Sequence, residues 1–424
     1  MKNIHKGWFI LTLITCCVLA SLGFGRFSFG AILPFMKTGL HLDYKETGYL
    51  ASSIFLGYFI AVIVAGYFVI RFKAKKVIVF SLFFIALGMV LTANSSNFYI
   101  TFLGCLIIGL GTGGAYVPSL GLLGHWFASK SRGMALGIAM GGSGIGIVFS
   151  GLTMPMLIQQ TGDNGWRIGW YLLASLIILI TLLNVLFLKN RPEDLNLKPI
   201  VKGQEALLIK EQPGASEETT IYQNKTIWFL GFIYFTWGMS YLVFSTFLVD
   251  YLIVDVGFTN EAAGTFFAIA GITSIISGFI WGSLSDRVGR MFTLMIVFFS
   301  QSFLLLSLSF SENSVLLFLI TAVYGVTLWG VPTIINATVI EYIHPKYITI
   351  AMGFVTVFFS TGQLVSPIIT GFLIEYANSY FSAFLFSSVS ALFGGLGCIK
   401  LLLNKRKKAE QSSVEIHILN VKDS

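Results

Sequence analysis

Charged residues are scarce in this chain. Asp, Glu, Lys and Arg make up 11% of its 424 residues, whereas hydrophobic residues make up 55%. The charged share of a soluble globular protein is about 25%, so this composition excludes an ordinary soluble protein and indicates a protein surrounded by lipid. The 44 glycines and 40 phenylalanines fit helices that pack closely inside a bilayer.

The sequence also lacks the residue patterns of an enzyme. Its four cysteines, Cys16, Cys17, Cys105 and Cys398, all lie in apolar segments, and their spacing fits neither a disulfide framework nor a metal site. No phosphate-binding loop and no pairing of a nucleophile with a base is present. We therefore expect no enzymatic activity, no cofactor and no metal, and we expect the cysteines to pack as small hydrophobic residues.

Twelve apolar segments are long enough to cross a membrane as helices, which takes about 20 residues. We predict them near residues 8–36, 46–70, 76–94, 98–124, 133–159, 168–188, 227–252, 261–283, 292–310, 315–340, 347–374 and 381–403. The expected fold is therefore an all-α membrane protein. Its expected parts are an N-terminal six-helix half at 1–188, a polar linker at 189–225, a C-terminal six-helix half at 226–404 and a tail at 405–424.

An internal repeat relates the two halves at an offset of 216 residues. Gly66 matches Gly282, Arg71 matches Arg287, and Gly137 matches Gly353. Two parallel halves related by an axis along the membrane normal are typical of one class of secondary transporters. The same register needs the first apolar segment as the partner of the seventh, so we interpret that segment as a membrane span and not as a cleaved signal peptide.

Basic residues predict the orientation of the chain. If the N-terminus is cytoplasmic, 23 of the 27 Lys and Arg residues fall in cytoplasmic segments, Lys37, Lys45 and Arg167 lie outside, and Arg26 alone lies within a span. This asymmetry predicts a multi-pass protein of the cell membrane with both termini in the cytoplasm. It also explains the net charge of +8 without nucleic acid as a partner. We expect the basic tail to contact anionic lipid headgroups, and we expect a monomer.

Two segments carry a family resemblance. The segment from Gly282 to Arg290 resembles the signature loop of the major facilitator superfamily, and the segment from Trp126 to Gly144 is similar to a signature of the monocarboxylate porters and the oxalate/formate antiporters. The resemblance implies a transporter that moves a small organic anion, with a monocarboxylate favoured, by alternating access. It also implies a conformational latch at the cytoplasmic face, formed by Gly282, Asp286, Arg287, Gly289 and Arg290.

The sequence departs from the patterns of these families in places, so other functions stay open. Drug/proton antiporters of the superfamily carry an Arg in the fourth span where this chain has Cys105, and the eighth span at 261–283 lacks the basic residue that many monocarboxylate porters have. The alternative to an anion transporter is an exporter of drugs or of other cationic or neutral solutes with the same fold. A third hypothesis is a membrane receptor that transports nothing, although no soluble domain is visible.

Arg26 is the most informative single candidate for a binding site. A guanidinium group in hydrocarbon costs at least about 2.5 kcal/mol, so it must face water, an anion or an acid. Its planar fork suits a carboxylate, which makes Arg26 the candidate for binding the substrate's negative charge. The other interpretation is structural, with the side chain reaching the interface or pairing with an acid.

Further candidates lie on the helices that line the central cavity in the resembled superfamily, which are the first, fourth, seventh and tenth. Tyr116 lies on the fourth, Tyr234, Trp237 and Tyr241 follow helical spacing on the seventh, and Asn336 lies on the tenth. Hydroxyl, indole and amide groups beside a cation suit a small carboxylate. For any one of these aromatic residues, packing is the alternative role.

Acidic residues give no clear proton pathway. Asp250 lies eight residues beyond the position that the repeat matches to Arg26, which is about 12 Å of helix rise, so we do not expect the two to pair. Asp250 is a candidate outer gate residue or proton site, or else an interfacial residue. Proton symport and anion exchange both stay open. Glu341 is expected to pair with a base of the 282–290 loop, and the glycines from Gly137 to Gly146 predict a closely packed fifth helix.

Overall fold

The computed structural model describes residues 5–127, 129–198, 200, 224–311, 313–343 and 348–422. Eleven helical stretches within these ranges are long and apolar enough to cross a membrane, and one bent pair of helices makes a twelfth. The prediction of an all-α membrane protein with twelve spans is therefore confirmed. Of the predicted linker at 189–225, residues 201–223 lie outside the described part of the chain.

Eight long or medium helices and two short ones build the N-terminal half. The first span combines three consecutive segments: α1 (Lys6–Val18), the π-helix η1 (Leu19–Phe27) and α2 (Ser28–Leu40). The following spans are α3 (Tyr44–Phe72), α4 (Ala74–Ala93), α5 (Phe98–Trp126), α6 (Ser129–Thr161) and α7 (Gly165–Phe187), with short 3₁₀ turns η2 (Gly162–Asn164) and η3 (Pro192–Leu195).

The C-terminal half repeats this order with two broken spans. Its helices are α8 (Lys225–Val254), α9 (Asn260–Ser274), α10 (Ser277–Val288), α11 (Arg290–Leu308), α12 (Ser314–Leu328), α13 (Gly330–Tyr342), α14 (Ile348–Ala377) and α15 (Phe381–Lys422). The pair α9 and α10 forms the eighth span with a bend of 41°, and α12 with α13 forms the tenth.

Side-chain caps begin many of these helices. The Asp43 side chain accepts a hydrogen bond from Glu46 N, and the Glu46 carboxylate accepts one from Asp43 N, which is a capping box at the start of α3. Asn97 and Asn313, which the repeat relates, begin α5 and α12, and the side-chain oxygen of each accepts hydrogen bonds from backbone N–H groups of its helix. Each cap satisfies backbone N–H groups that the helix itself leaves free, so polar turn residues fix where the spans begin.

The two broken spans lie beside each other and share hydrogen bonds at their breaks. Trp329 N donates to Ser277 Oγ at 2.9 Å, and Trp281 Nε1 donates to Val326 O at 2.8 Å. Backbone groups freed inside a membrane need partners within the protein, and these bonds supply them. The breaks are therefore stable features of the C-terminal half.

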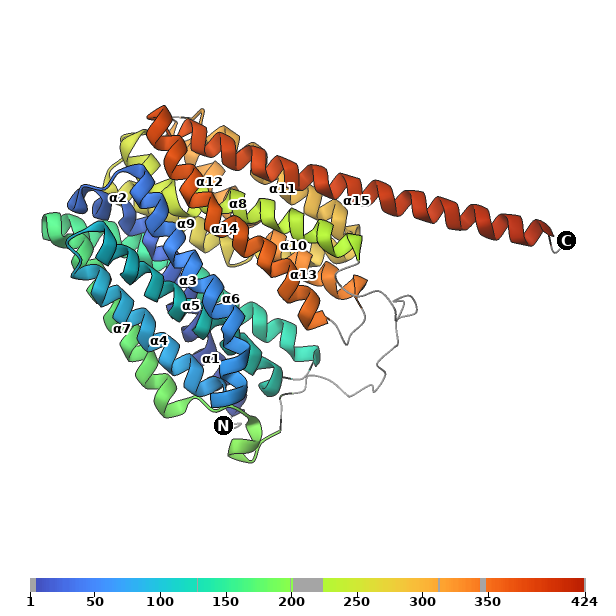
Figure 1. Ribbon diagram of the computed structural model, residues 1–424, viewed down its shortest axis with the longest axis horizontal. Coiled ribbons are helices and arrows are strands. Elements are labelled where there is room, and N and C mark those ends of the chain that lie inside the picture. Colours follow the sequence, from blue (N-terminus) through green and yellow to red (C-terminus); the bar gives the residue numbers. More distant parts are fainter. Residues whose placement is uncertain are drawn as a thin grey trace.

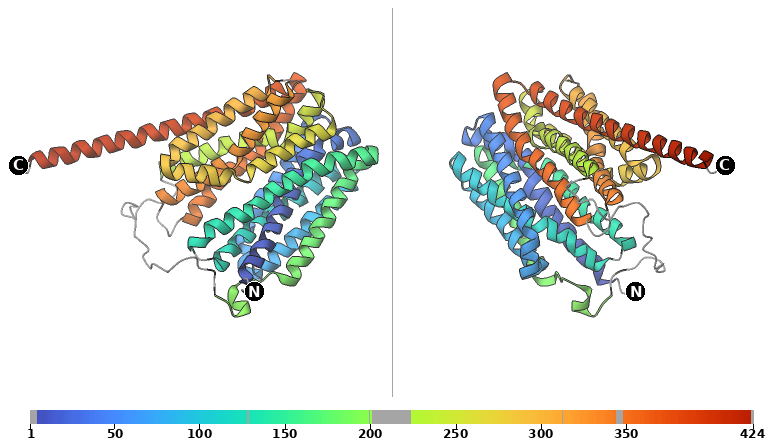
Figure 2. Two further views of the ribbon diagram at one scale, coloured as in Figure 1. Left: turned by 180° about the vertical axis from the view of Figure 1, so that it is seen from behind. Right: turned by 45° about the vertical axis from the view of Figure 1, so that its right-hand side comes forward.

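The two halves meet closely at one end of the bundle and diverge at the other. In Figure 1 the N-terminal half, blue to green, lies beside the C-terminal half, yellow to red, with α3 next to α14. Figure 2 shows the halves diverging toward the end where α1 begins and α15 leaves the bundle. We call that end the terminal face, and the opposite end, with the turns at 41–43, 255–259 and 378–380, the closed face.

Close backbone approaches join the halves. A Cβ added to Gly30 would lie 2.2 Å from Ser245 O, and one added to Gly48 would lie 2.4 Å from Pro367 O. Within the fifth span, Gly144 and Gly146 pack closely, but Gly137 and Gly141 have open space beside them. We predicted close packing from Gly137 to Gly146. This prediction is wrong at Gly137 and Gly141, which lie toward the terminal face, where the halves have diverged.

The repeat extends to backbone geometry. Gly289 joins α10 to α11 with φ +107°, and Lys73, which the offset of 216 relates to it, joins α3 to α4 with φ +69°. A positive φ is sterically unfavourable for a lysine, whereas a glycine adopts it freely because it has no Cβ. Both halves therefore use the same turn geometry, although the first half has Lys73 where the second has Gly289.

Candidate functional site

Arg26 bridges the two halves at the centre of the bundle. Its Nη2 donates to Tyr241 Oη at 2.7 Å, and the side chain is buried, with 8% of its surface exposed. Its guanidinium carbon lies 4.5 Å from the ring centroid of Phe55 and 5.0 Å from that of Tyr58, both on α3. A phenol oxygen and two aromatic faces thus stabilise the Arg26 cation, which has no acidic partner among the described residues.

The backbone around Arg26 is a π-helix. Residues Leu19–Phe27 form it, and Ser28 N closes its end on Gly23 O. Gly23 and Gly25 let the segment approach α6 and α5, since a Cβ on Gly23 would lie 2.8 Å from Gly146 Cα and one on Gly25 would lie 2.5 Å from Thr112 Cγ2. Such single π segments inside α-helices occur frequently at functional sites. Here the segment places Arg26 at the seam between the halves.

A stack of aromatic rings adjoins Arg26. The rings of Trp237 and Tyr241 lie 4.3 Å apart and 13° from parallel, and the Phe359 ring of α14 stacks on Tyr234 at 4.4 Å and on Trp237 at 5.1 Å. The sequence predicted the three α8 residues as one face, and the structure brings them together. Phe359 was missed, because no periodicity distinguished it from the other phenylalanines of α14.

Several buried polar atoms at this site have no hydrogen-bond partner among the described residues. They are Arg26 Nε, Trp237 Nε1 and Gln363 Oε1. Gln363 Nε2 meanwhile donates to Tyr241 Oη, so Tyr241 accepts from both Arg26 and Gln363. Unpaired buried polar atoms are rare and each calls for an explanation, such as a ligand that pairs with them. Gln363 was not among the residues predicted to line the cavity.

Tyr116 and Asn336 are the other residues that were predicted to line the cavity. Tyr116 lies close enough to Arg26 and Tyr58 for electrostatic interaction, and its hydroxyl donates to Met140 Sδ at 3.3 Å. Asn336 is half-buried on α13. The structure therefore brings Tyr116, Tyr234, Trp237 and Tyr241 together near Arg26.

Asp250 forms a second polar link between the halves, at the closed face. Lys37 Nζ lies 2.9 Å from Asp250 Oδ2 and 3.2 Å from Oδ1, and Tyr380 Oη also donates to this carboxylate. The Asp250 side chain is 1% exposed and that of Lys37 is 14% exposed. The expectation that Asp250 does not pair with Arg26 holds. Arg26 is not the only basic residue within a span, however, because the first span extends to Leu40 and includes Lys37.

Two further groups support this link. Tyr44 N donates to Glu375 Oε2 at 3.1 Å, which joins α3 to α14, and Tyr380 N donates to Asp255 Oδ2 at 3.1 Å. Burial raises the pKa of Asp255 above its usual value, and the neighbouring charge of Asp250 raises it further. The hydrogen bonds and ring contacts that join the halves within the described residues all lie at Arg26 or nearer the closed face.

The predicted latch residues lie at the terminal face and pair within the C-terminal half. Arg290 Nη1 contacts Asp286, while Arg290 Nε donates to Glu341 Oε1 at 2.9 Å and thereby confirms the predicted pairing of Glu341. Asp286 is 61% exposed, and Arg287 is exposed as well. Gly282 lies beside Thr333 of α13, and Gly289 is the positive-φ residue between α10 and α11. Asp286 and Arg287 are therefore exposed at the terminal face.

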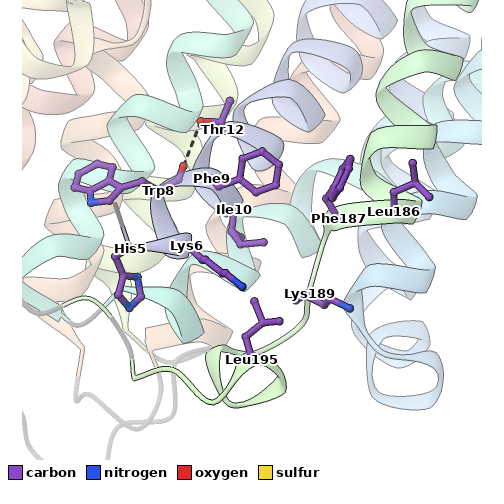
Figure 3. A pocket seen from close by; sticks show the side chains of 10 residues that line it. All are labelled: His5, Lys6, Trp8, Phe9, Ile10, Thr12, Leu186, Phe187, Lys189 and Leu195. Atoms are coloured by element: carbon purple, nitrogen blue, oxygen red, sulfur yellow. Dashed lines mark hydrogen bonds between the residues drawn. The ribbon is translucent and has the colours of Figure 1, made fainter. Parts of the chain in front are cut away.

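An apolar groove of about 650 Å³ lies away from this centre, at the terminal face. Figure 3 shows its walls, with Phe9 of α1 across from Phe187 at the end of α7, and Lys6 and Lys189 at its edge. It contains none of the predicted site residues. Its position at the helix ends and its apolar lining give no reason to regard it as a transport site.

Comparison with known proteins identifies the family. The sequence profile of the Major Facilitator Superfamily matches residues 15–357. The chain belongs to this superfamily. It is thus a multi-pass membrane transporter, as the resemblance of its 282–290 loop implied.

Among curated members of the superfamily, the chain is 24% identical over 426 residues to a probable sulfoacetate transporter, SauU, of Cupriavidus necator, with 95% of each chain covered. It is 23% identical over 381 residues to the hexuronate transporter of Bacillus subtilis, covering 87% of this chain and 88% of that one. It is also 25% identical over 350 residues to human monocarboxylate transporter 12, covering 76% and 66%.

Solved structures of major facilitator transporters share the fold. A bacterial homologue of the lysosomal transporter Spinster, in an inward-facing and unoccupied conformation, has a TM-score of 0.75 at 16% identity, covering 95% of this chain and 98% of that one. The nucleoside transporter NupG has a TM-score of 0.70 at 14% identity, covering 94% and 99%. Both likenesses support the twelve-helix arrangement in two halves.

Proposed function

We propose that this major facilitator transporter moves a small organic anion, with one carboxylate as the favoured charged group, across the cell membrane by alternating access. The observation that carries the proposal is Arg26, a buried cation at the centre of the bundle with an unpaired Nε and no described acidic partner. A carboxylate would supply the charge that this guanidinium lacks. The names of the sulfoacetate, hexuronate and monocarboxylate relatives point to the same class of solute.

In this proposal the closed face is extracellular and the terminal face is cytoplasmic, with both termini in the cytoplasm, because the basic residues concentrate on the terminal side. Lys37 and Asp250 then act as an outer gate that holds the halves together while the site opens inward. Asp250 is also the candidate proton site, because its carboxylate is buried between the two halves and loses its contact with Lys37 when the gate opens.

The latch residues act at the other face, where they stabilise the state that is closed to the cytoplasm. Asp286 and Arg287 are exposed in this conformation, and with Arg290 they would meet the N-terminal half when the cytoplasmic side closes. A latch of this kind requires the two six-helix halves, which the linker at 189–225 joins, to move as rigid units. The transporter acts as a monomer in contact with membrane lipid.

A ligand screen tests the proposed substrate class. Purified protein is heated with monocarboxylates, dicarboxylates, amine drugs and sugars in turn, and its unfolding temperature is measured. A ligand that binds only the folded protein raises this temperature. Stabilisation by carboxylates alone supports the proposal, whereas stabilisation by amine drugs alone would favour the cation exporter.

A further inference from the structure

Two apolar grooves lie on either side of the last turns of α7, at the terminal face. The first, of about 650 Å³, runs between α1 and the end of α7, where the rings of Phe9 and Phe187 meet edge to face at 5.7 Å (Figure 3). The second, of about 460 Å³, runs between α4 and α7 and has Phe80, Phe83 and Val185 in its walls. These five side chains are all exposed, so both grooves offer apolar surface to the surroundings of the N-terminal half.

Lysine side chains lie at the membrane-surface end of both grooves. Lys6 and Lys189 line the first groove, and Lys75 and Lys76 line the second. They come from the start of α1, the start of α4 and the residues that follow α7, which are all at the terminal face. Both grooves therefore have the same polarity, with cations at the surface of the membrane and apolar walls deeper in the span.

Two of these lysines are held close to each other by the fold. Lys75 Nζ donates to Val185 O at 2.7 Å and Lys75 N donates to Asn190 Oδ1 at 2.9 Å, which fixes the start of α4 to the end of α7. Lys189 O accepts from Trp126 Nε1 at 3.2 Å. Lys189 lies close enough to Lys75 for their charges to repel each other. An anion between the two ammonium groups would turn this repulsion into attraction.

No acid of the described residues neutralises these lysines. The ion pairs within the described part of the chain have only Lys37 and Arg290 as their bases. The acids of η3, Glu193 and Asp194, are exposed, and Asp194 Oδ2 accepts from Arg191 N at 3.2 Å. The lysines of the two grooves thus carry positive charge that an outside partner can pair.

From this arrangement we infer that α1, α4 and α7 form a site for a phospholipid with an anionic headgroup, whose phosphate binds Lys75 and Lys189 and whose two acyl chains occupy the two grooves. Basic pockets between membrane helices at the cytoplasmic side bind acidic headgroups in this way. The end of α7 lies between the grooves, so one headgroup there can extend a chain into each. The site lies within the N-terminal half and is separate from Arg26, so it stands or falls independently of the proposed substrate.

Native mass spectrometry of the purified full-length protein tests this site. Dissociation constants are measured for phosphatidylglycerol and for phosphatidylcholine with the same acyl chains. We expect phosphatidylglycerol to bind at least about tenfold more tightly, because phosphatidylcholine carries no net charge and two lysines attract the anionic lipid. The double variant Lys75→Gln/Lys189→Gln should lose most of this preference. Lys189→Gln alone keeps the bond from Lys75 to Val185 and should lower the preference severalfold.

Lys225→Gln is the matched control, because Lys225 is an exposed lysine at the terminal face of the other half, at the start of α8. It should keep the full preference for phosphatidylglycerol. Soluble glycerol phosphate is the control for a free anion, and we expect it not to displace phosphatidylglycerol at equal concentration, since it cannot fill the grooves.

Four results would overturn the inference. The first is equal binding of the two lipids. The second is a preference that survives in the double variant, which would assign the anionic lipid to other charges such as those of the basic tail at 405–424. The third is an equal loss in Lys225→Gln, which would indicate a general effect of surface charge. The fourth is displacement by glycerol phosphate, which would mean that the lysines bind a free phosphate and the grooves hold no chains.

Discussion

Arg26 and Tyr241 join the two halves at nearly equivalent positions of the internal repeat. They are 215 residues apart, one fewer than the repeat offset of 216, and their side chains meet at 2.7 Å. A bond between equivalent positions lies near the axis that relates the halves, where rocking moves atoms least. Tyr241 Oη therefore holds Arg26 in this conformation. An anionic ligand can bind the Arg26 guanidinium there in place of Tyr241 or beside it.

The outer gate gives a first prediction. Asp250→Asn removes the charge that Lys37 contacts, so the closed face should open more often and a cysteine at Ser245, buried behind the gate, should react faster with an impermeant thiol reagent. The reaction rate is measured in a background without the four native cysteines. We expect an increase of about tenfold or more, because breaking a buried pair costs about 3–5 kcal/mol.

Asp43→Asn is the control for this gate. Asp43 lies at the same face but caps its own helix through Glu46 N, and Asn caps helices equally well. Labelling at Ser245 should stay unchanged in this variant. Equal labelling in Asp250→Asn and Asp43→Asn would remove the gate role from Asp250.

Gly30 gives a second prediction. An added Cβ would strike Ser245 O at 2.2 Å across the seam, so Gly30→Ala should disfavour the closed face and lower transport at least about tenfold. The folded yield should hold, since Ala favours helices and the halves can separate. Gly66→Ala is the matched control because Gly66 has no atom within 4 Å of such a Cβ. Normal transport by Gly30→Ala would mean that this close approach is not needed during the cycle.

The latch gives a third prediction. Asp286→Asn should slow transport severalfold while the protein folds and reaches the membrane normally, because Asp286 is mostly exposed here and makes its contribution when the terminal face closes. Transport rate and membrane yield are measured together. Glu341→Gln breaks only the pair with Arg290 inside the C-terminal half and should affect transport less. If the two variants behave alike, the loop is a structural ion-pair cluster and not a latch.

Orientation gives a fourth prediction. Ser96 and Ser314 are exposed beside the capping residues Asn97 and Asn313 at the closed face, so single cysteines there should react with an impermeant thiol reagent added outside intact cells. A cysteine at Gly203, in the expected linker, should react only after the cells are opened. Labelling of Gly203→Cys in intact cells would reverse the proposed topology.

The spans and the repeat could be predicted from the sequence, because apolar length and glycine spacing are local signals. The Tyr234, Trp237 and Tyr241 face followed from helical periodicity in the same way. The Lys37–Asp250 pair and Phe359 could not be predicted, since they depend on which helices of opposite halves meet. Lys37 was placed outside the membrane because its charge was counted toward a loop, whereas its buried partner keeps it within the first span.

The role of Arg26 is tested most directly by ligand affinity and folded yield measured on the same variants. Arg26→Gln should weaken binding of a carboxylate substrate by about 1.5–3 kcal/mol, which is about 10- to 150-fold, and Arg26→Lys should weaken it less because the charge remains but the fork is lost. Arg167→Gln is the control, since Arg167 bonds backbone carbonyls at Ala93 and Ser95. It should lower yield without changing affinity. An anion site predicts lost affinity with preserved yield in Arg26→Gln, and unchanged affinity with reduced yield would contradict it.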